Sequence, residues 1–171
     1  MDLGRGADQV VDDLVAAASR WAVVFGVGPF HVLPRIQTAC TDRGVDSSVD
    51  MQVGVAQAGP AQVELIQVFG DPPSIFRDRP AGVHQLCTIT ADYDGKVARF
   101  RGLGYEVACE LASPVQRVAF VDTEADFGFF TEITEGPSSF VEAVAGIART
   151  CEGWDGTDPV RLLTRDGYRI P

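Results

Sequence analysis

The chain has 171 residues, of which 46% are apolar and 22% are charged, a composition typical of a globular protein with a substantial core. Its formal net charge is −10, from 24 acidic and 14 basic residues. This balance argues against a nucleic-acid-binding protein, because contacts with phosphates require a basic face.

The N-terminal sequence is acidic where a secretory signal would be basic, and no stretch reaches the length of a membrane span. The four cysteines lie far apart and form no Cys-x-x-Cys pair. Cys87 and Cys109 lie in apolar, strand-like runs, where a reduced, buried thiol is the usual state. We therefore expect a cytoplasmic protein that does not contact a membrane.

The first half of the chain predicts a strand, a helix and three further strands. A short extended segment at residues 9–11 precedes Asp13, which is suited to cap a helix. Apolar residues then recur at helical spacing, namely Leu14, Ala17, Ala18, Trp21 and Phe25. The glycines of residues 26–29 end this helix. Strands are expected at 30–36, 49–58 and 61–69, before a proline-rich loop at 70–81.

The second half repeats this order. A strand is predicted at residues 83–90, Asp92 is the next helix cap, and Gly102 to Gly104 close a short helix. Strands follow at 105–111, 116–122 and 129–134. Asp13 and Asp92 are 79 residues apart (92 − 13), which indicates an internal repeat of one structural unit.

The C-terminal residues 136–171 predict one more helix and a tail. Ser139 and Glu142 have the spacing of a capping box. The apolar face of this helix is formed by Val141, Val144, Ile147, Ala148 and Cys151. The tail is expected to clamp the sheet or to contact a second subunit, with simple packing on the sheet as the preferred interpretation.

With this repeat, the sequence resembles the vicinal-oxygen-chelate superfamily, which includes glyoxalase, bleomycin-resistance and methylmalonyl-CoA epimerase-like proteins. The resemblance rests on GVGPF at residues 26–30, VELIQ at 63–67, GVHQ at 82–85 and GFFTEI at 128–133. It implies an α+β fold with two βαβββ modules, at about 1–70 and 82–135, whose cupped mixed sheets surround a central cavity. Residues 1–171 would form one domain, and a homodimer is expected.

The resemblance also implies a metal site with ligands from the first and last strands of each module. The last-strand positions fall on Glu64 and Glu132, and the first-strand position of the second module falls on Gln85. The corresponding position in the first module falls near Arg5 or Gly6, and neither is a credible ligand. An oxygen-only set of Glu64, Gln85 and Glu132 suits a hard ion, so we expect no metal or a weakly held divalent ion.

The other residues expected to bind the substrate are Gln85, Phe30, His31, His84 and Phe130. His31 is equally compatible with facing the cavity or the solvent. His84 is expected on the opposite strand face from Gln85, and a histidine at the start of a strand is more often structural. A shift of register by one residue would instead place His84 in the cavity.

Carboxylates inside apolar strands are uncommon, so Glu64 and Glu132 are the predicted catalytic residues. One hypothesis is an isomerase, epimerase or lyase that moves a proton next to a carbonyl of a small, largely apolar substrate. The alternative is a metal-free protein that sequesters a hydrophobic small molecule, as antibiotic-resistance members of the superfamily do. The missing histidine ligands favour the binder, and the two retained carboxylates favour the enzyme.

Overall fold

The computed structural model of the protein describes residues 2–77, 82–113 and 116–171, with the side chains of residues 2–5 left out of that description. The first unit begins with strand β1 (Asp2–Val10) and helix α1 (Leu14–Phe25). Four strands follow: β2 (Phe30–Val32), β3 (Ile36–Asp42), β4 (Val45–Ala58) and β5 (Ala61–Phe69). The strand predicted at 30–36 is confirmed only at residues 30–32, because the segment after β2 contains Pro34 and leaves the sheet.

The second unit follows the short helix η1 (Ser74–Phe76). It contains β6 (Gln85–Thr90), α2 (Tyr93–Gly102), β7 (Val107–Ala112), β8 (Arg117–Val121), α3 (Glu124–Phe127) and β9 (Phe130–Glu135). The one-turn helix α3 was not predicted. The strand β3 was not predicted either, so the first unit has four strands after its helix where three were expected. The second unit otherwise has the predicted order of strand, helix and three strands.

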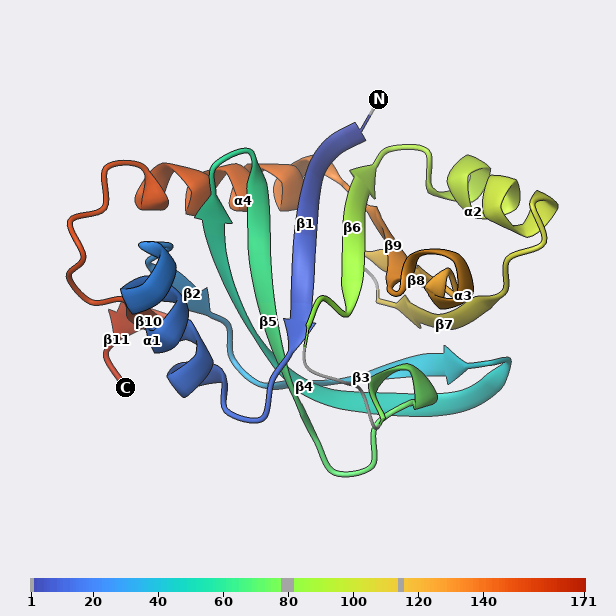
Figure 1. Ribbon diagram of the computed structural model, residues 1–171, viewed down its shortest axis with the longest axis horizontal. Coiled ribbons are helices and arrows are strands. Elements are labelled where there is room, and N and C mark those ends of the chain that lie inside the picture. Colours follow the sequence, from blue (N-terminus) through green and yellow to red (C-terminus); the bar gives the residue numbers. More distant parts are fainter. Residues whose placement is uncertain (1, 78–81, 114–115) are drawn as a thin grey trace.

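The two units join at both edges into one curved sheet (Figure 1). Within each unit the first and last strands pair in parallel, β1 with β5 and β6 with β9. Between the units, β1 pairs with β6 and β3 pairs with β7, both antiparallel. Because β4 also pairs with β5, the sheet closes on itself and encloses the space between the two units.

The helix caps predicted from the sequence are present. The side chain of Asp13 accepts a hydrogen bond from Ala16 N, and that of Asp92 accepts one from Gly95 N. Gly26 ends α1 with φ of 64°, a conformation that favours glycine. Leu14 and Ala18 of α1 then pack in a core with β4, β5 and the C-terminal strand β10 (Val160–Thr164).

A second core lies between the units, around η1. Ile75 and Phe76 are buried there against residues of both units, including Val49, Phe120 and Phe130. The linker between the units is thereby packed into the molecule at one end of the enclosed space.

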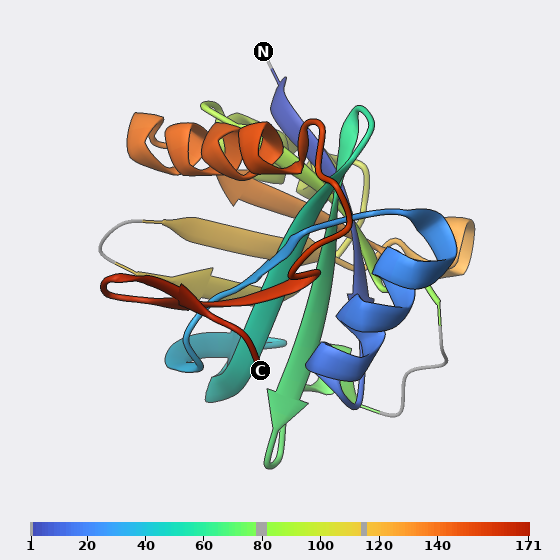
Figure 2. The same ribbon diagram turned by 90° about the vertical axis from the view of Figure 1, so that its left-hand side faces the viewer.

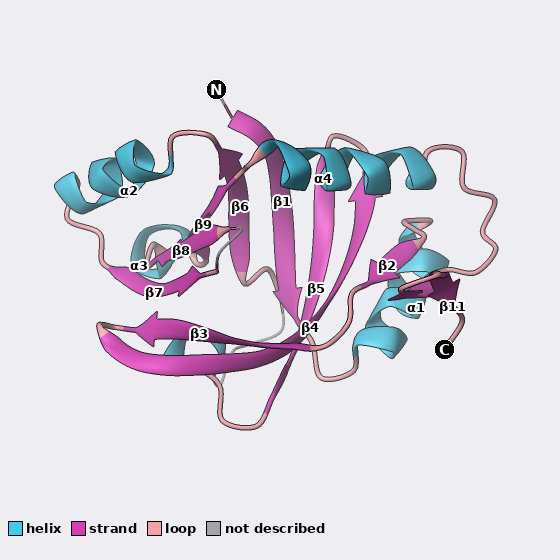
Figure 3. Cartoon of the chain, turned by 180° about the vertical axis from the view of Figure 1, so that it is seen from behind, coloured by secondary structure: helices cyan, strands magenta, loops and turns pink. Residues whose placement is uncertain are grey.

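The C-terminal segment forms helix α4 (Ser138–Cys151) and a hairpin of β10 and β11 (Gly167–Arg169). The predicted capping box is wrong: α4 starts after Pro137, and no side chain forms a cap hydrogen bond. The tail extends the sheet, because β10 pairs in parallel with β2. Figures 2 and 3 show α4 crossing the sheet near the turn between β4 and β5. In the described part of the chain, no helix is long and apolar enough to span a bilayer.

Candidate active site

The central strands β9, β6, β1 and β5 bring four acidic or amide side chains to one face of the sheet. Asp8 pairs in register with Glu64 on one side and with Gln85 on the other. Two residues beyond Gln85, and so on the same face, Cys87 pairs with Glu132 of β9. All five residues line one cavity of about 190 Å³.

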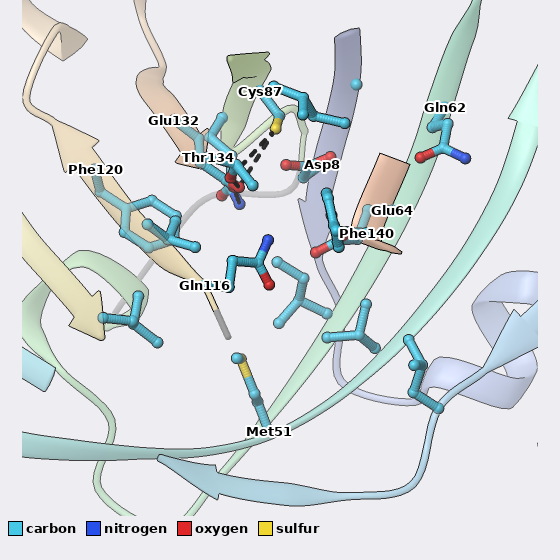
Figure 4. A pocket seen from close by; sticks show the side chains of 18 of the residues that line it. Asp8, Met51, Gln62, Glu64, Cys87, Gln116, Phe120, Glu132, Thr134 and Phe140 are labelled. Atoms are coloured by element: carbon cyan, nitrogen blue, oxygen red, sulfur yellow. Dashed lines mark hydrogen bonds between the residues drawn. The ribbon is translucent and has the colours of Figure 1, made fainter. Parts of the chain in front are cut away.

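The rest of the cavity wall is mainly apolar. It includes Met51 and Val53 of β4, Leu111 of β7, and Val118 and Phe120 of β8. Phe140 of α4 completes the wall near Glu64 (Figure 4). Gln116 extends its amide into the same space (Figure 4). The cavity therefore combines a carboxyl cluster with an apolar surface contributed by both units.

Glu132 accepts hydrogen bonds from three neighbours. Gln85 Nε2 donates to Oε2 at 2.8 Å, and Thr134 Oγ1 donates to Oε1 at 2.5 Å. Cys87 Sγ lies 3.4 Å from the same Oε1. These donors orient a buried carboxylate and supply the hydrogen bonds that water would otherwise provide.

Asp8 is 2% exposed and is hydrogen-bonded to Glu132. Burial raises the pKa of Asp8 well above its ordinary value, and the negative charges of Glu64 and Glu132 raise it further. Two charged carboxylates in contact repel each other in a buried site, so the surroundings favour the proton-bound form of Asp8.

Glu64 differs from this pair because it is free to contact a ligand. Burial, followed by repulsion from Glu132, raises the pKa of Glu64 to about 8. Among the described residues, no side chain forms a hydrogen bond with its carboxyl group. Figure 4 shows Glu64 and Glu132 on either side of Asp8. Glu64 is thus a carboxyl group that can exchange a proton near neutral pH.

The structure brings together three of the predicted site residues, Glu64, Gln85 and Glu132. Phe30 and Phe130, which were expected to bind substrate, are fully buried in the two cores and lie outside the cavity lining. Phe130 pairs with Gln85 and lies on the same face of β9 as Glu132, but core packing covers both phenylalanine side chains completely, so the geometry does not support their predicted role.

The two histidines also lie outside the lining. His31 Nε2 contacts Thr150 Oγ1 of α4 at 2.6 Å. His84 packs between Phe76 and Phe130, and its Nε2 donates to the Ile75 carbonyl at 2.6 Å. His84 also contacts the side chain of Gln85 through Nδ1, so it packs against two residues of the cavity lining, Phe76 and Gln85. Its role is to hold η1 against β6.

The sequence analysis missed Asp8, which occupies the first-strand position assigned to Arg5 or Gly6. That position was counted back from the helix cap, and the two units differ there. Asp8 precedes Asp13 by five residues (13 − 8), whereas Gln85 precedes Asp92 by seven (92 − 85). The buried acid in β1 was the signal that would have identified it. Cys87 was also missed, because it was interpreted only as a buried thiol.

The fold and the sequence pattern together define the class of protein. Residues 8–120 match the model of the glyoxalase/bleomycin resistance protein/dioxygenase superfamily, and the chain belongs to this superfamily. No curated protein matches the chain significantly.

Solved structures with a similar fold have low sequence identity. Methylmalonyl-CoA epimerase from Mycobacterium tuberculosis is 17% identical, with a TM-score of 0.54, covering 81% of this chain and 91% of that one. A methylmalonyl-CoA epimerase in complex with methylmalonyl-CoA and NH4+ is 18% identical, with a TM-score of 0.53 and coverage of 78% and 93%. A hypothetical protein from Bacillus halodurans C-125 is 11% identical, with a TM-score of 0.53 and the same coverage.

Proteins of this superfamily often bind a divalent metal ion, and the carboxyl cluster is chemically suited to one. Ligand atoms of Asp8, Cys87 and Glu132 lie within 4.8 Å of one another, and Glu64 lines the same cavity. A divalent ion would compensate the repulsion that raises the pKa values of Asp8 and Glu64. The Gln85 amide donates from Nε2 to Glu132 Oε2 and contacts His84 Nδ1 with its other end, so it orients Glu132.

Proposed function

We propose that the protein is an enzyme of the isomerase or epimerase type that moves a proton next to a carbonyl group. A lyase that begins with the same removal of a proton is the second form of this proposal. The observation that carries this proposal is Glu64, which has no hydrogen-bond partner among the described side chains, faces the cavity and has a pKa of about 8. A general base is most effective when its pKa lies near the working pH.

In this proposal Glu64 removes the proton from the carbon next to the carbonyl. The hydrogen-bonded pair of Asp8 and Glu132 holds a second proton nearby, which can return to the carbon from another direction. The Gln116 amide supplies a neutral hydrogen-bond donor for the developing oxyanion. A divalent ion held by the carboxylates, when bound, would supply further polarisation of the carbonyl oxygen.

The dimensions of the cavity support a small substrate group. A volume of about 190 Å³ accommodates a short acyl or carbonyl group, and the apolar wall favours an alkyl substituent. The structural neighbours include an epimerase bound to an acyl-CoA thioester, so acyl thioesters are the first candidates. The remainder of a large thioester would lie outside the cavity.

Hydrogen exchange tests this proposal directly. Short-chain acyl thioesters are incubated with the protein in D₂O, and deuterium at the carbon next to the carbonyl is measured by mass spectrometry. Enzyme-dependent exchange with at least one thioester is the expected result, and Glu64→Gln should remove most of it. Tight binding without exchange would instead indicate the alternative function, a protein that sequesters a hydrophobic molecule.

Two expectations from the sequence analysis remain predictions. The homodimer is tested by light scattering at micromolar concentration. The cytoplasmic location is tested by fractionation of cells that produce the protein.

A further inference from the structure

Cys87 lies at the centre of the carboxyl cluster. It is on β6, in register with Gly6 of β1 on one side and Glu132 of β9 on the other. Because Gly6 has no side chain, nothing on β1 at that level separates the Cys87 thiol from Asp8 two residues further along. The thiol, the Asp8 carboxyl and the Glu132 carboxyl therefore meet in one small volume, with ligand atoms within 4.8 Å of one another.

We propose that Cys87 is a metal ligand, and that Asp8, Cys87 and Glu132 form a mixed sulfur and oxygen site selective for a thiophilic divalent ion such as Zn²⁺ over Mg²⁺. This goes beyond the proposed function, and it differs from the oxygen-only set expected from the sequence. Thiolate ligands favour Zn²⁺, whereas Mg²⁺ is bound almost entirely by oxygen.

The geometry of the Cys87–Glu132 pair supports this assignment. Cys87 Sγ and Glu132 Oε1 are 3.4 Å apart. Two ligands of one tetrahedral Zn²⁺, with a sulfur bond of about 2.3 Å and an oxygen bond of about 2.1 Å, are separated by roughly 3.5 Å. The two atoms already have the separation that a shared ion requires.

The surroundings of Glu132 resemble the outer shell of a metal site. Gln85 Nε2 and Thr134 Oγ1 donate to the two carboxyl oxygens and restrict the orientation of the group. Outer hydrogen bonds of this kind commonly fix ligating side chains and raise metal affinity. Glu64 stays outside the three-residue group and remains available to a substrate.

Cobalt provides a spectroscopic test that needs no substrate. The full chain is treated with a chelator, dialysed and titrated with Co²⁺, since a cobalt–thiolate bond produces an intense charge-transfer band in the near ultraviolet. We expect the band to saturate at one equivalent, Zn²⁺ to abolish it and excess Mg²⁺ to leave it unchanged. Cys87→Ser should remove the band and weaken Zn²⁺ binding by at least about tenfold. The matched control is Cys151→Ser, a half-buried thiol outside the cavity, which should keep the band.

A second measurement uses the unaltered protein. In a calorimetric titration of the wild type, Zn²⁺ should bind at one equivalent, and excess Mg²⁺ should not compete with it. The inference would be overturned by any of three results: cobalt binding without a thiolate band, no metal binding at all, or displacement of the bound ion by Mg²⁺. Exchange of the substrate proton by the chelator-treated protein is a separate measurement. The proposed function can therefore fail or hold independently of the metal site.

Discussion

Asp8 on β1 lies directly beside Glu64 on β5, because the two strands run parallel with these residues in register. Like charges in such positions normally destabilise a sheet. Here both side chains face the cavity, and burial raises the pKa of each; Glu64 and Glu132 raise that of Asp8 further, and Glu132 raises that of Glu64. The native protein therefore holds protons that the unfolded chain would release, and this relationship has measurable consequences for stability and activity.

Stability should decrease as the pH rises. The pKa of Glu64 is raised from an ordinary value of 4.5 to about 8, so its contribution to stability is fully present below pH 4.5 and is lost as pH rises through about 8. The melting temperature of the wild type should fall between pH 5 and 8.5 by about 4 °C more than that of Glu64→Gln. Equal pH slopes for the two proteins, measured by differential scanning calorimetry, would contradict this assignment.

Replacing the base should reduce turnover far more than binding. Glu64→Gln keeps the size and polarity of the side chain but cannot take a proton. Exchange of the substrate proton should slow by about two to four orders of magnitude, while affinity changes little. In the wild type, the rate should rise with pH around the Glu64 pKa of about 8. The exposed Glu152→Gln is the matched control and should leave both quantities unchanged. Full exchange by Glu64→Gln would exclude Glu64 as the base.

The size of the substrate group should depend on Phe140. This residue of α4 lies outside the part of the chain that matches the superfamily model, yet it lines the cavity. Phe140→Ala should weaken binding of short acyl groups and improve binding of longer ones, each by about tenfold, because the wall recedes. Calorimetry with thioesters of increasing chain length measures the shift. Phe127→Ala on α3, whose ring is 60% exposed, should show no such change.

His31 should contribute to the stability of the fold and not to substrate binding. Its Nε2 contacts Thr150 Oγ1, which ties β2 to the C-terminal helix. His31→Ala should lower the free energy of unfolding by about 1–3 kcal/mol because a half-satisfied polar contact remains. Thr150→Val removes the other partner, and the double variant should cost less than the sum of the two. A tenfold loss of ligand affinity in His31→Ala would restore the substrate-binding role predicted from the sequence.

The sequence alone was sufficient to predict the repeat and its local signals. Asp13 and Asp92 cap the two helices and Gly26 ends the first, because caps and left-handed turns depend on a few neighbouring residues. Glu64 and Glu132 were identifiable because carboxylates are rare within apolar strands. The motifs were sufficient for the fold, since their order reflects a chain that forms the same unit twice.

Only the tertiary structure decided which side chains share the cavity. Asp8 lies five residues before the cap of α1, whereas Gln85 lies seven residues before the cap of α2, and this difference moved the first-module position from Arg5 or Gly6 to Asp8. Phe30, His31 and Phe130 lie in the cores or against α4, because packing between distant segments decides which side chains are covered. The addition of β10 and β11 to β2 and the meeting of Cys87 with Asp8 and Glu132 likewise depend on pairing between distant segments. Local sequence specifies caps, turns and periodicity, whereas register and closure of the sheet are set by packing across the whole chain.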